Sequence, residues 1–121
     1  MQIKVKRIYE APAQDDGFRV LVDRLWPRGV SKEAAAIDLW LKEAAPSTEL
    51  RRWFHQARSD WPEFTRRYTA ELDANRQALQ PLLDAGQQGA VTLLYASRDE
   101  AHNHAVLLQA YLETMSDNHQ S

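Results

Sequence analysis

Three segments of the chain have the hydrophobic patterning of β-strands. Residues 3–9 (IKVKRIY) alternate apolar and polar positions, which is the period of a half-buried strand. Because lysines occupy polar positions there, this segment suits the edge of a sheet. Residues 18–25 and 90–96 instead contain continuous apolar runs, typical of strands that are covered on both faces. The pattern therefore predicts one edge strand and two central strands of a layered α/β sheet.

A fourth strand is predicted at residues 37–43, where the pattern is ambiguous. Ile37, Leu39 and Leu41 alternate with polar residues as in a strand, yet helical spacing also gathers apolar residues on one face. We favour the strand, because an alanine-rich segment ends where β-favouring residues begin. The orientation of the first two strands is open. Their connection, residues 10–17, is shorter than the dozen residues of a usual parallel crossover, which favours a hairpin.

Four segments have the periodicity or the capping residues of helices. The predicted helices cover residues 32–36, 48–57, 61–86 and the segment after residue 99. Ser31, Asp60 and Asp99 are the predicted N-caps of the first, third and fourth helices. Pro81 is predicted to break or kink the third helix, and Gly86 to end it.

These elements indicate an α/β protein with one sheet of about four strands, a mostly parallel core and flanking helices in Rossmann-like layers. The length of 121 residues suits a single domain, predicted over residues 1–116, with a disordered tail at 117–121. The chain contains no cysteine, which excludes disulfides, thiolate metal sites and thiol nucleophiles. Neither a membrane span nor a signal peptide is evident, so we expect a cytoplasmic protein without a membrane partner.

The charge argues against a general nucleic-acid binder. A net charge of −2 lacks the basic excess that counterion release requires. An alternative function is a nucleic-acid-associated regulator that uses arginine-rich middle helices. Those arginines are Arg51, Arg52, Arg58, Arg66 and Arg67. Interleaved acidic residues favour an ordinary solvated helix face instead. The oligomeric state is open, and an exposed Trp40 or Trp53 would indicate an interface between copies.

Two loops that follow the central strands carry the residue types of an anion site. Ligands of α/β sheets bind beyond the carboxyl ends of strands, where loops lead into helix N-termini with free N–H groups. If the central strands are neighbours, the two loops converge and their guanidiniums favour a phosphate or a carboxylate. The predicted ligand-binding residues are Arg24, Trp26, Arg28 and Gly29 in the first loop, and Ser97, Arg98 and Asn103 in the second. His102 is the predicted general acid or base.

Several of these residues also have a structural interpretation. Asp23 and Arg24 could pair with each other at the corner after the strand, and Trp26 could be a core or lid aromatic. His104 shares a helix face with leucines, which favours a hydrogen-bonded core histidine. His102 and His104 are two positions apart and would diverge on a helix, so we predict no metal site and no cofactor.

Five blocks of the sequence carry a resemblance to a known family. They are VDRLWPRG, DLWLKEAAPS, LRRWF, WPEFTRRYTAEL and VTLLYASRDEAHNHAVLL. In this order, and over residues 3–113, the chain resembles the YeaO-like group within a larger bacterial family of domains of unknown function. The resemblance implies an α/β fold and carries no established activity.

The chain also departs from the pattern that this resemblance implies. Members of the larger family often have a cysteine near the start of the last loop and a Cys-His-Arg string where the last helix begins. Here Ala96 and residues 102–104 (His-Asn-His) fill those places. A thiol mechanism is therefore not open to this chain. We expect a protein that binds a small anionic ligand, with catalysis unassigned.

Overall fold

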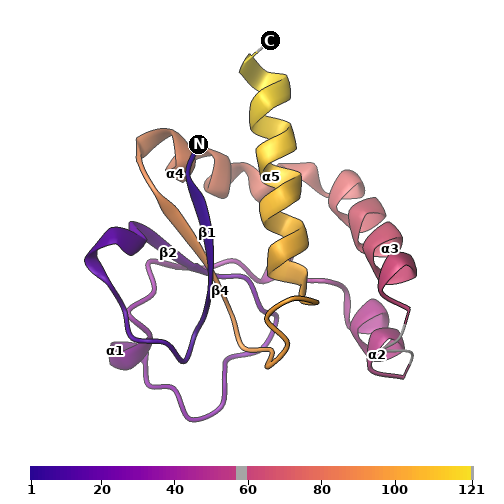
Figure 1. Ribbon diagram of the computed structural model, residues 1–121, viewed down its shortest axis with the longest axis horizontal. Coiled ribbons are helices and arrows are strands. Elements are labelled where there is room, and N and C mark those ends of the chain that lie inside the picture. Colours follow the sequence, from indigo (N-terminus) through magenta and orange to yellow (C-terminus); the bar gives the residue numbers. More distant parts are fainter. Residues whose placement is uncertain (57–59, 121) are drawn as a thin grey trace.

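One parallel sheet forms the centre of the protein. The computed structural model describes residues 1–56 and 60–120, with side chains as far as residue 115. Within that range the strands are β1 (Ile3–Arg7), β2 (Phe18–Leu21), β3 (Leu39–Trp40) and β4 (Val91–Tyr95). Their order is β1-β4-β2-β3, and each pairing is parallel. The predicted α/β class is confirmed, and the segments with continuous apolar runs form the interior strands (Figure 1).

The first two strands do not form the predicted hairpin. β1 and β2 are both parallel to β4 and flank it on opposite sides, with Val5 and Val20 each paired to Leu93. The chain returns from β1 to β2 through residues 8–17, which include a 3-10 turn at Gln14–Asp16. Ten extended residues can span roughly 33 Å, about twice the length of a five-residue strand. A crossover without a full helix therefore fits this short connection.

The described helices cover the two faces of the sheet unequally. They are α1 (Lys32–Ala35), α2 (Thr48–Gln56), α3 (Trp61–Ala74), α4 (Gln80–Gln88) and α5 (His104–Gln120). In Figure 1, α2, α3 and α5 lie on one side of the sheet and α1 lies on the other. The caps at Ser31 and Asp60 are confirmed, because Ser31 Oγ accepts from Ala34 N (3.0 Å) and Asp60 Oδ1 from Glu63 N (3.2 Å). No described helix is both long and apolar enough to cross a membrane.

The long helix predicted over residues 61–86 is two helices. α3 ends at Ala74, and a 3-10 turn at Arg76–Leu79 leads into α4. Pro81 does not break a helix, because it lies in the first turn of α4, where a missing N–H costs no helical hydrogen bond. Gly86 does not end the helix either, since α4 continues past it.

Two further predictions concern the length of β3 and the order of the C-terminal tail. β3 is shorter than predicted, because Leu39–Trp40 pair with β2 and a 3-10 turn follows at Lys42–Ala44. The predicted disordered tail, residues 117–121, lies beyond the residues whose side chains the structure describes. The backbone there belongs to α5 as far as Gln120, and the disorder of the tail stays a prediction.

The two faces of the sheet bury separate hydrophobic clusters. Along β4, Leu93 belongs to the larger cluster under α2–α5, whereas Leu94 belongs to the smaller cluster on the α1 side. β2 alternates in the same way, with Val20 in the larger cluster and Leu21 in the smaller one. All four side chains are fully buried. Both interior strands are therefore covered on both faces, as their apolar runs predict.

A buried ion pair lies on the α1 face of the sheet. Arg19 in β2 donates to Asp16 Oδ2 (2.5 Å) and to the carbonyl oxygens of Ala35 (2.8 Å) and Ala36 (3.0 Å) at the end of α1. Lys6 Nζ lies 3.2 Å from the same carboxylate. Burial would raise the pKa of Asp16, but hydrogen bonds from a backbone N–H and from the two cations outweigh it and hold that pKa below its ordinary value.

Removing Asp16 is predicted to destabilise the fold far more than removing its neighbour. Asp16→Ala leaves the Arg19 guanidinium buried without its counter-ion, so we expect the free energy of unfolding to fall by about 3–5 kcal/mol. Asp15→Ala is the matched control, because Asp15 is exposed and pairs with Lys4 at the surface, a contact worth about 0–1 kcal/mol. Urea unfolding at pH 7 measures both losses, and equal losses would contradict the role of Asp16.

The contribution of Asp16 is also predicted to depend on pH. Because its pKa is lower in the folded state than in the unfolded chain, its stabilisation is complete well above pH 4 and is lost as the pH falls further. The stability difference between the wild type and Asp16→Asn should therefore shrink as the pH falls from about 5 to about 2, through and below the usual aspartate pKa of about 3.9. Urea unfolding at several pH values tests this. A constant difference over that range would count against an ionised Asp16.

Candidate functional site

The loops that follow β2 and β4 converge on one cleft at the carboxyl ends of these strands. β2 and β4 are parallel neighbours, so both loops leave the sheet at the same edge, as expected for adjacent central strands. The cleft has a volume of about 760 Å³. Residues 23–28 and 96–99 line it from the two loops, and residues 102–104 line it from the start of α5. Side chains of α2 and α3 also line it, together with Tyr9 after β1 and residues 45–46 before α2.

Asp23 and Arg24 anchor the first loop, and they do so without pairing with each other. Asp23 Oδ2 accepts a hydrogen bond from Ala96 N (3.0 Å), which ties the segment after β2 to the end of β4. Arg24 donates to the carbonyl oxygens of Pro46 (3.3 Å) and Ala45 (3.4 Å), just before α2. Arg24 therefore holds the α2 segment against the cleft that it lines.

Arg28 and Arg98 are exposed cations of the cleft, one from each loop. Neither side chain has a hydrogen-bonding or ionic partner in the described part of the chain. Ser97 also lines the cleft, and its Oγ accepts a hydrogen bond from Asp99 N (3.2 Å). Gly29, which the sequence places with the ligand-binding residues, has a φ of 73° in the turn after Arg28 and does not line the cleft.

Trp26 is held by contacts within the protein. Its Nε1 donates to Val30 O (2.7 Å), and its ring meets the Trp40 ring edge-on with 5.4 Å between centroids. Trp26 lines the cleft as a fixed aromatic. Trp40 is half-buried, with the Lys42 ammonium 4.2 Å from its ring centroid, and Trp53 is also half-buried. Neither tryptophan therefore forms the exposed patch that would indicate an interface between copies.

Arg51 lines the cleft, although the sequence favours a solvated helix face for it. In α2 it lies three residues before Phe54, and both side chains reach the cleft. Arg51 Nε is buried without a hydrogen-bond partner among the described residues, whereas Arg52 is exposed and does not line the cleft. A buried guanidinium nitrogen without an acceptor is costly. The signal that could have located Arg51 is its helical spacing from Phe54.

His104 is a hydrogen-bonded structural histidine, as its helix face predicts. At the start of α5, its Nε2 forms a hydrogen bond with Val22 O (2.9 Å) and lies 3.1 Å from Asp23 Oδ1, which is buried without a hydrogen-bond partner among the described residues. The imidazole also meets the Tyr68 ring edge-on at 6.1 Å. Burial and two nearby carboxylates raise the pKa of Tyr68, which keeps the phenol neutral as it donates to Ala44 O (2.5 Å).

His102 lies in the turn before α5 and lines the cleft. Its side chain is 55% exposed, and its Nδ1 is 3.6 Å from Asp99 Oδ2. The imidazole packs against Trp61, with 4.9 Å between ring centroids. Within the part of the chain that the structure describes, no three His, Asp or Glu side chains gather closely enough to hold a metal ion.

The N-cap of α5 is Asn103 and not Asp99. Asn103 Oδ1 accepts from Val106 N (3.1 Å), and its Nδ2 donates to the carbonyl oxygens of residues 99 (2.9 Å) and 100 (3.1 Å). Asp99 caps the preceding turn, where Oδ1 accepts from the N–H of His102 (2.9 Å) and of the residue before it (3.0 Å), and these bonds lower the pKa of Asp99. The buried Asn103 amide, predicted to bind the ligand, is thus occupied in shaping the loop.

The described arginines of α3 share one carboxylate. Arg66 and Arg67 bind Glu63 at 2.6 and 2.7 Å, and these hydrogen bonds lower the pKa of Glu63 to about 2. Arg67 also lies over the Trp53 ring, 4.2 Å from its centroid. Arg58, the remaining arginine between α2 and α3, is outside the described residues. This arrangement matches a solvated helix face with its charges paired.

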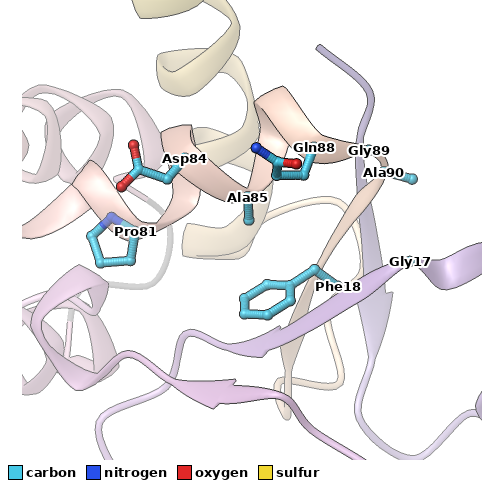
Figure 2. A pocket seen from close by; sticks show the side chains of 8 residues that line it. All are labelled: Gly17, Phe18, Pro81, Asp84, Ala85, Gln88, Gly89 and Ala90. Atoms are coloured by element: carbon cyan, nitrogen blue, oxygen red, sulfur yellow. The ribbon is translucent and has the colours of Figure 1, made fainter.

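A second cavity, of about 520 Å³, opens at the opposite end of the sheet, where β2 and β4 begin (Figure 2). The residues that line it are Gly17, Phe18, Pro81, Asp84, Ala85, Gln88, Gly89 and Ala90. Figure 2 shows the Phe18 ring between β2 and α4. Among these lining residues Asp84 is the one charged group, so the cavity does not suit an anion.

Comparison with known proteins relates the chain to one family. The family model described as "Inactive DUF488-N3 subclade" matches residues 2–121. The chain is 44% identical over 115 residues to "Uncharacterized protein YeaO" of Escherichia coli K12, which covers 95% of this chain and 100% of that protein. It is 40% identical over 111 residues to "Uncharacterized protein Rv3073c" of Mycobacterium tuberculosis H37Rv, covering 92% and 93%. No solved structure matches the chain significantly.

His102 and His104, which both line the cleft, are predicted to differ in their contribution to stability. His104→Ala leaves Val22 O without its hydrogen-bond partner and removes the imidazole beside the buried Asp23 Oδ1, so we expect the free energy of unfolding to fall by about 1–3 kcal/mol. His102→Ala is the matched control, because it truncates an exposed side chain, and we expect a change of about 0.5 kcal/mol. Denaturant unfolding at pH 7 measures both. A loss for His102→Ala as large as that for His104→Ala would overturn the structural assignment of His104.

Proposed function

This chain belongs to the DUF488-N3 family, in the subclade described as inactive, and we propose that it binds a small phosphate- or carboxylate-bearing molecule in the cleft. The observation that carries the proposal is an excess of arginines over carboxylates around one cavity. The arginines are Arg24, Arg28, Arg51 and Arg98, and the carboxylates are Asp23 and Asp99. An anion would balance this charge and accept hydrogen bonds from several guanidiniums at once.

Each of the two carboxylates of the cleft accepts hydrogen bonds from backbone N–H groups, although Asp23 Oδ1 is buried without a hydrogen-bond partner among the described residues. Asp23 accepts from a backbone N–H and lies against His104, and Asp99 accepts from two backbone N–H groups. Within the described residues, these carboxylates therefore do not pair with the arginines of the cleft. By contrast, the guanidinium of Arg19, elsewhere in the fold, donates to a carboxylate and to two carbonyl oxygens. Unsatisfied guanidinium nitrogens are costly where they are buried, as at Arg51. A bound phosphate or carboxylate would supply the acceptors that the protein itself does not offer there.

Binding, and not catalysis, is the function that we propose. The end of β4 presents Ala96, whose methyl group cannot act as a nucleophile. Ser97 Oγ accepts from a backbone N–H and has no adjacent base in the described contacts. His102, the predicted acid or base, serves in this proposal as a further hydrogen-bond donor to the anion. The description of the subclade as inactive supports the same conclusion.

Arg51→Met is predicted to weaken anion binding while leaving the free protein folded. The substitution keeps an apolar stem and removes the guanidinium, so we expect the dissociation constant of a bound anion to rise about 10- to 100-fold, corresponding to about 1.5–3 kcal/mol for a charge-assisted hydrogen bond. Arg28→Ala should have a similar effect. Arg52→Met is the matched control, because Arg52 is on the same helix but does not line the cleft. The dissociation constant of the anion from this variant should equal that from the wild type.

The measurement is the midpoint of thermal unfolding with phosphate, sulfate, sugar phosphates, nucleotides and carboxylates. An anion at about 100 times its dissociation constant should add about 2.7 kcal/mol of stability. A stabilisation that Arg52→Met retains, and that Arg51→Met and Arg28→Ala lose, supports the proposal. The absence of stabilisation by every anion, or an equal stabilisation of all four proteins, contradicts it.

A further inference from the structure

The cleft is much larger than an inorganic anion. Its volume of about 760 Å³ is within the range of about 300–1,000 Å³ that is typical of pockets for organic ligands. A free phosphate or sulfate ion has the volume of only a few water molecules, at about 30 Å³ each. Most of the cleft would then hold water. The size of the cleft therefore favours an anionic group attached to an organic body.

Exposed apolar side chains lie at the same cleft. Among the described residues, the large hydrophobic side chains that remain exposed are Met1, Tyr9 and Leu25. Tyr9 is 48% exposed and Leu25 is 59% exposed, and both line the cleft. Single exposed hydrophobic residues are common on protein surfaces, but two of these three are next to the cations of one cavity. A ligand with both an anionic and an apolar part matches this distribution.

The Tyr9 ring is held between the two loops that carry the cations. Its hydroxyl donates to Arg28 O (3.2 Å) in the first loop. The Arg7 guanidinium lies 5.1 Å from the Tyr9 ring centroid, and Arg7 Nε donates to Ser97 O (3.0 Å) in the second loop. These contacts fix the ring without burying it. A fixed, half-exposed aromatic ring is a surface on which a planar ring can stack at little entropic cost.

The placement of the arginines favours a phosphate over a carboxylate. Three guanidiniums that lack an acceptor at one or more nitrogens reach the cleft from three separate segments. They are Arg28 after β2, Arg51 on α2 and Arg98 after β4. A phosphomonoester has three acceptor oxygens and a charge of about −1.5 to −2 at pH 7. A carboxylate has two oxygens in one plane and a single charge, so it offers fewer acceptors and less charge to three guanidiniums from separate segments.

From these observations we infer that the ligand is a phosphomonoester whose organic part contains a planar ring. Its phosphate lies among Arg28, Arg51 and Arg98, and its ring stacks on Tyr9 beside Leu25. Phosphorylated aromatic or heterocyclic compounds, including nucleoside monophosphates, have this chemistry. The inference rests on the proposed function, which requires an anion in the same cleft but leaves its chemical class open.

Three small compounds separate the two parts of this inference. Phenyl phosphate and ethyl phosphate have the same head group and differ in the ring, whereas phenyl phosphate and benzoate share the ring and differ in the anion. Isothermal titration calorimetry of the full chain at pH 7.5 measures each dissociation constant. We expect phenyl phosphate to bind about tenfold more tightly than ethyl phosphate, as stacking on one aromatic side chain allows. We expect a similar margin over benzoate.

Variants of Tyr9 show whether the ring of the ligand stacks where we infer. Tyr9→Ala should reduce the advantage of phenyl phosphate over ethyl phosphate to within about twofold, because stacking is lost. Tyr9→Phe keeps the ring and should retain most of the advantage. Tyr111→Phe is a control, because Tyr111 donates to Asp73 on another surface and does not line the cleft. Its affinities should match those of the wild type.

Each of the other possible outcomes contradicts one particular part of the inference. Equal affinities for phenyl and ethyl phosphate, both lost in Arg51→Met, would overturn the ring and leave the proposed function intact. Benzoate binding as tightly as phenyl phosphate would overturn the preference for phosphate. An advantage of phenyl phosphate that survives Tyr9→Ala would overturn the role of Tyr9. Binding of none of these compounds, together with no thermal shift by any anion, would overturn the proposed function as well.

Discussion

The parallel pairing of β4 between β1 and β2 is the constraint on which the cleft depends. Leu93 pairs with Val5 on one side and with Val20 on the other, and β4 is buried along its whole length. This central position directs the chain after β2 and the chain after β4 to the same edge of the sheet. The hydrogen bond from Ala96 N to Asp23 then joins the two loops directly. Cations from distant parts of the sequence share one cavity for this reason.

The arginines near the two ends of β2 differ in whether the protein supplies acceptors for their guanidinium groups. At the start of β2, Arg19 is buried but donates to Asp16 and to two carbonyl oxygens, so the fold satisfies the guanidinium internally. Beyond its end, Arg51 has a buried Nε without an acceptor, and the Arg28 guanidinium has no partner among the described residues. At the same cleft, Asp23 Oδ2 accepts from a backbone N–H, while Asp23 Oδ1 lies 3.1 Å from the His104 imidazole without a hydrogen bond. This contrast within one small protein distinguishes a structural ion pair from the cleft in which we propose that an anion binds.

Much of the fold could be predicted from local patterns. The apolar runs of β2 and β4, and the caps at Ser31 and Asp60, depend on residues within a few positions of each other. The error in the orientation of the first two strands concerns a feature that depends on distant partners. The parallel orientation of β1 and β2 results from the insertion of β4, which comes about 70 residues later in the chain. Pro81 also has different effects in the interior and in the first turn of a helix.

At the cleft, residue types and loop positions were enough to place Arg24, Arg28 and Arg98 at the carboxyl ends of the strands, because adjacent parallel strands leave a sheet at one edge. Local sequence did not reveal that Arg51 faces the cleft or that Asn103 caps α5. A helical period shows which residues share a face but not which face is buried, and an Asx residue can cap any of several nearby turns. Packing of α2 against α3 decided the first, because the buried face of a helix is set by contacts with segments far apart in the sequence. The path of the loop after β4 decided the second, because it brings the carbonyl groups of residues 99 and 100 within reach of the Asn103 amide.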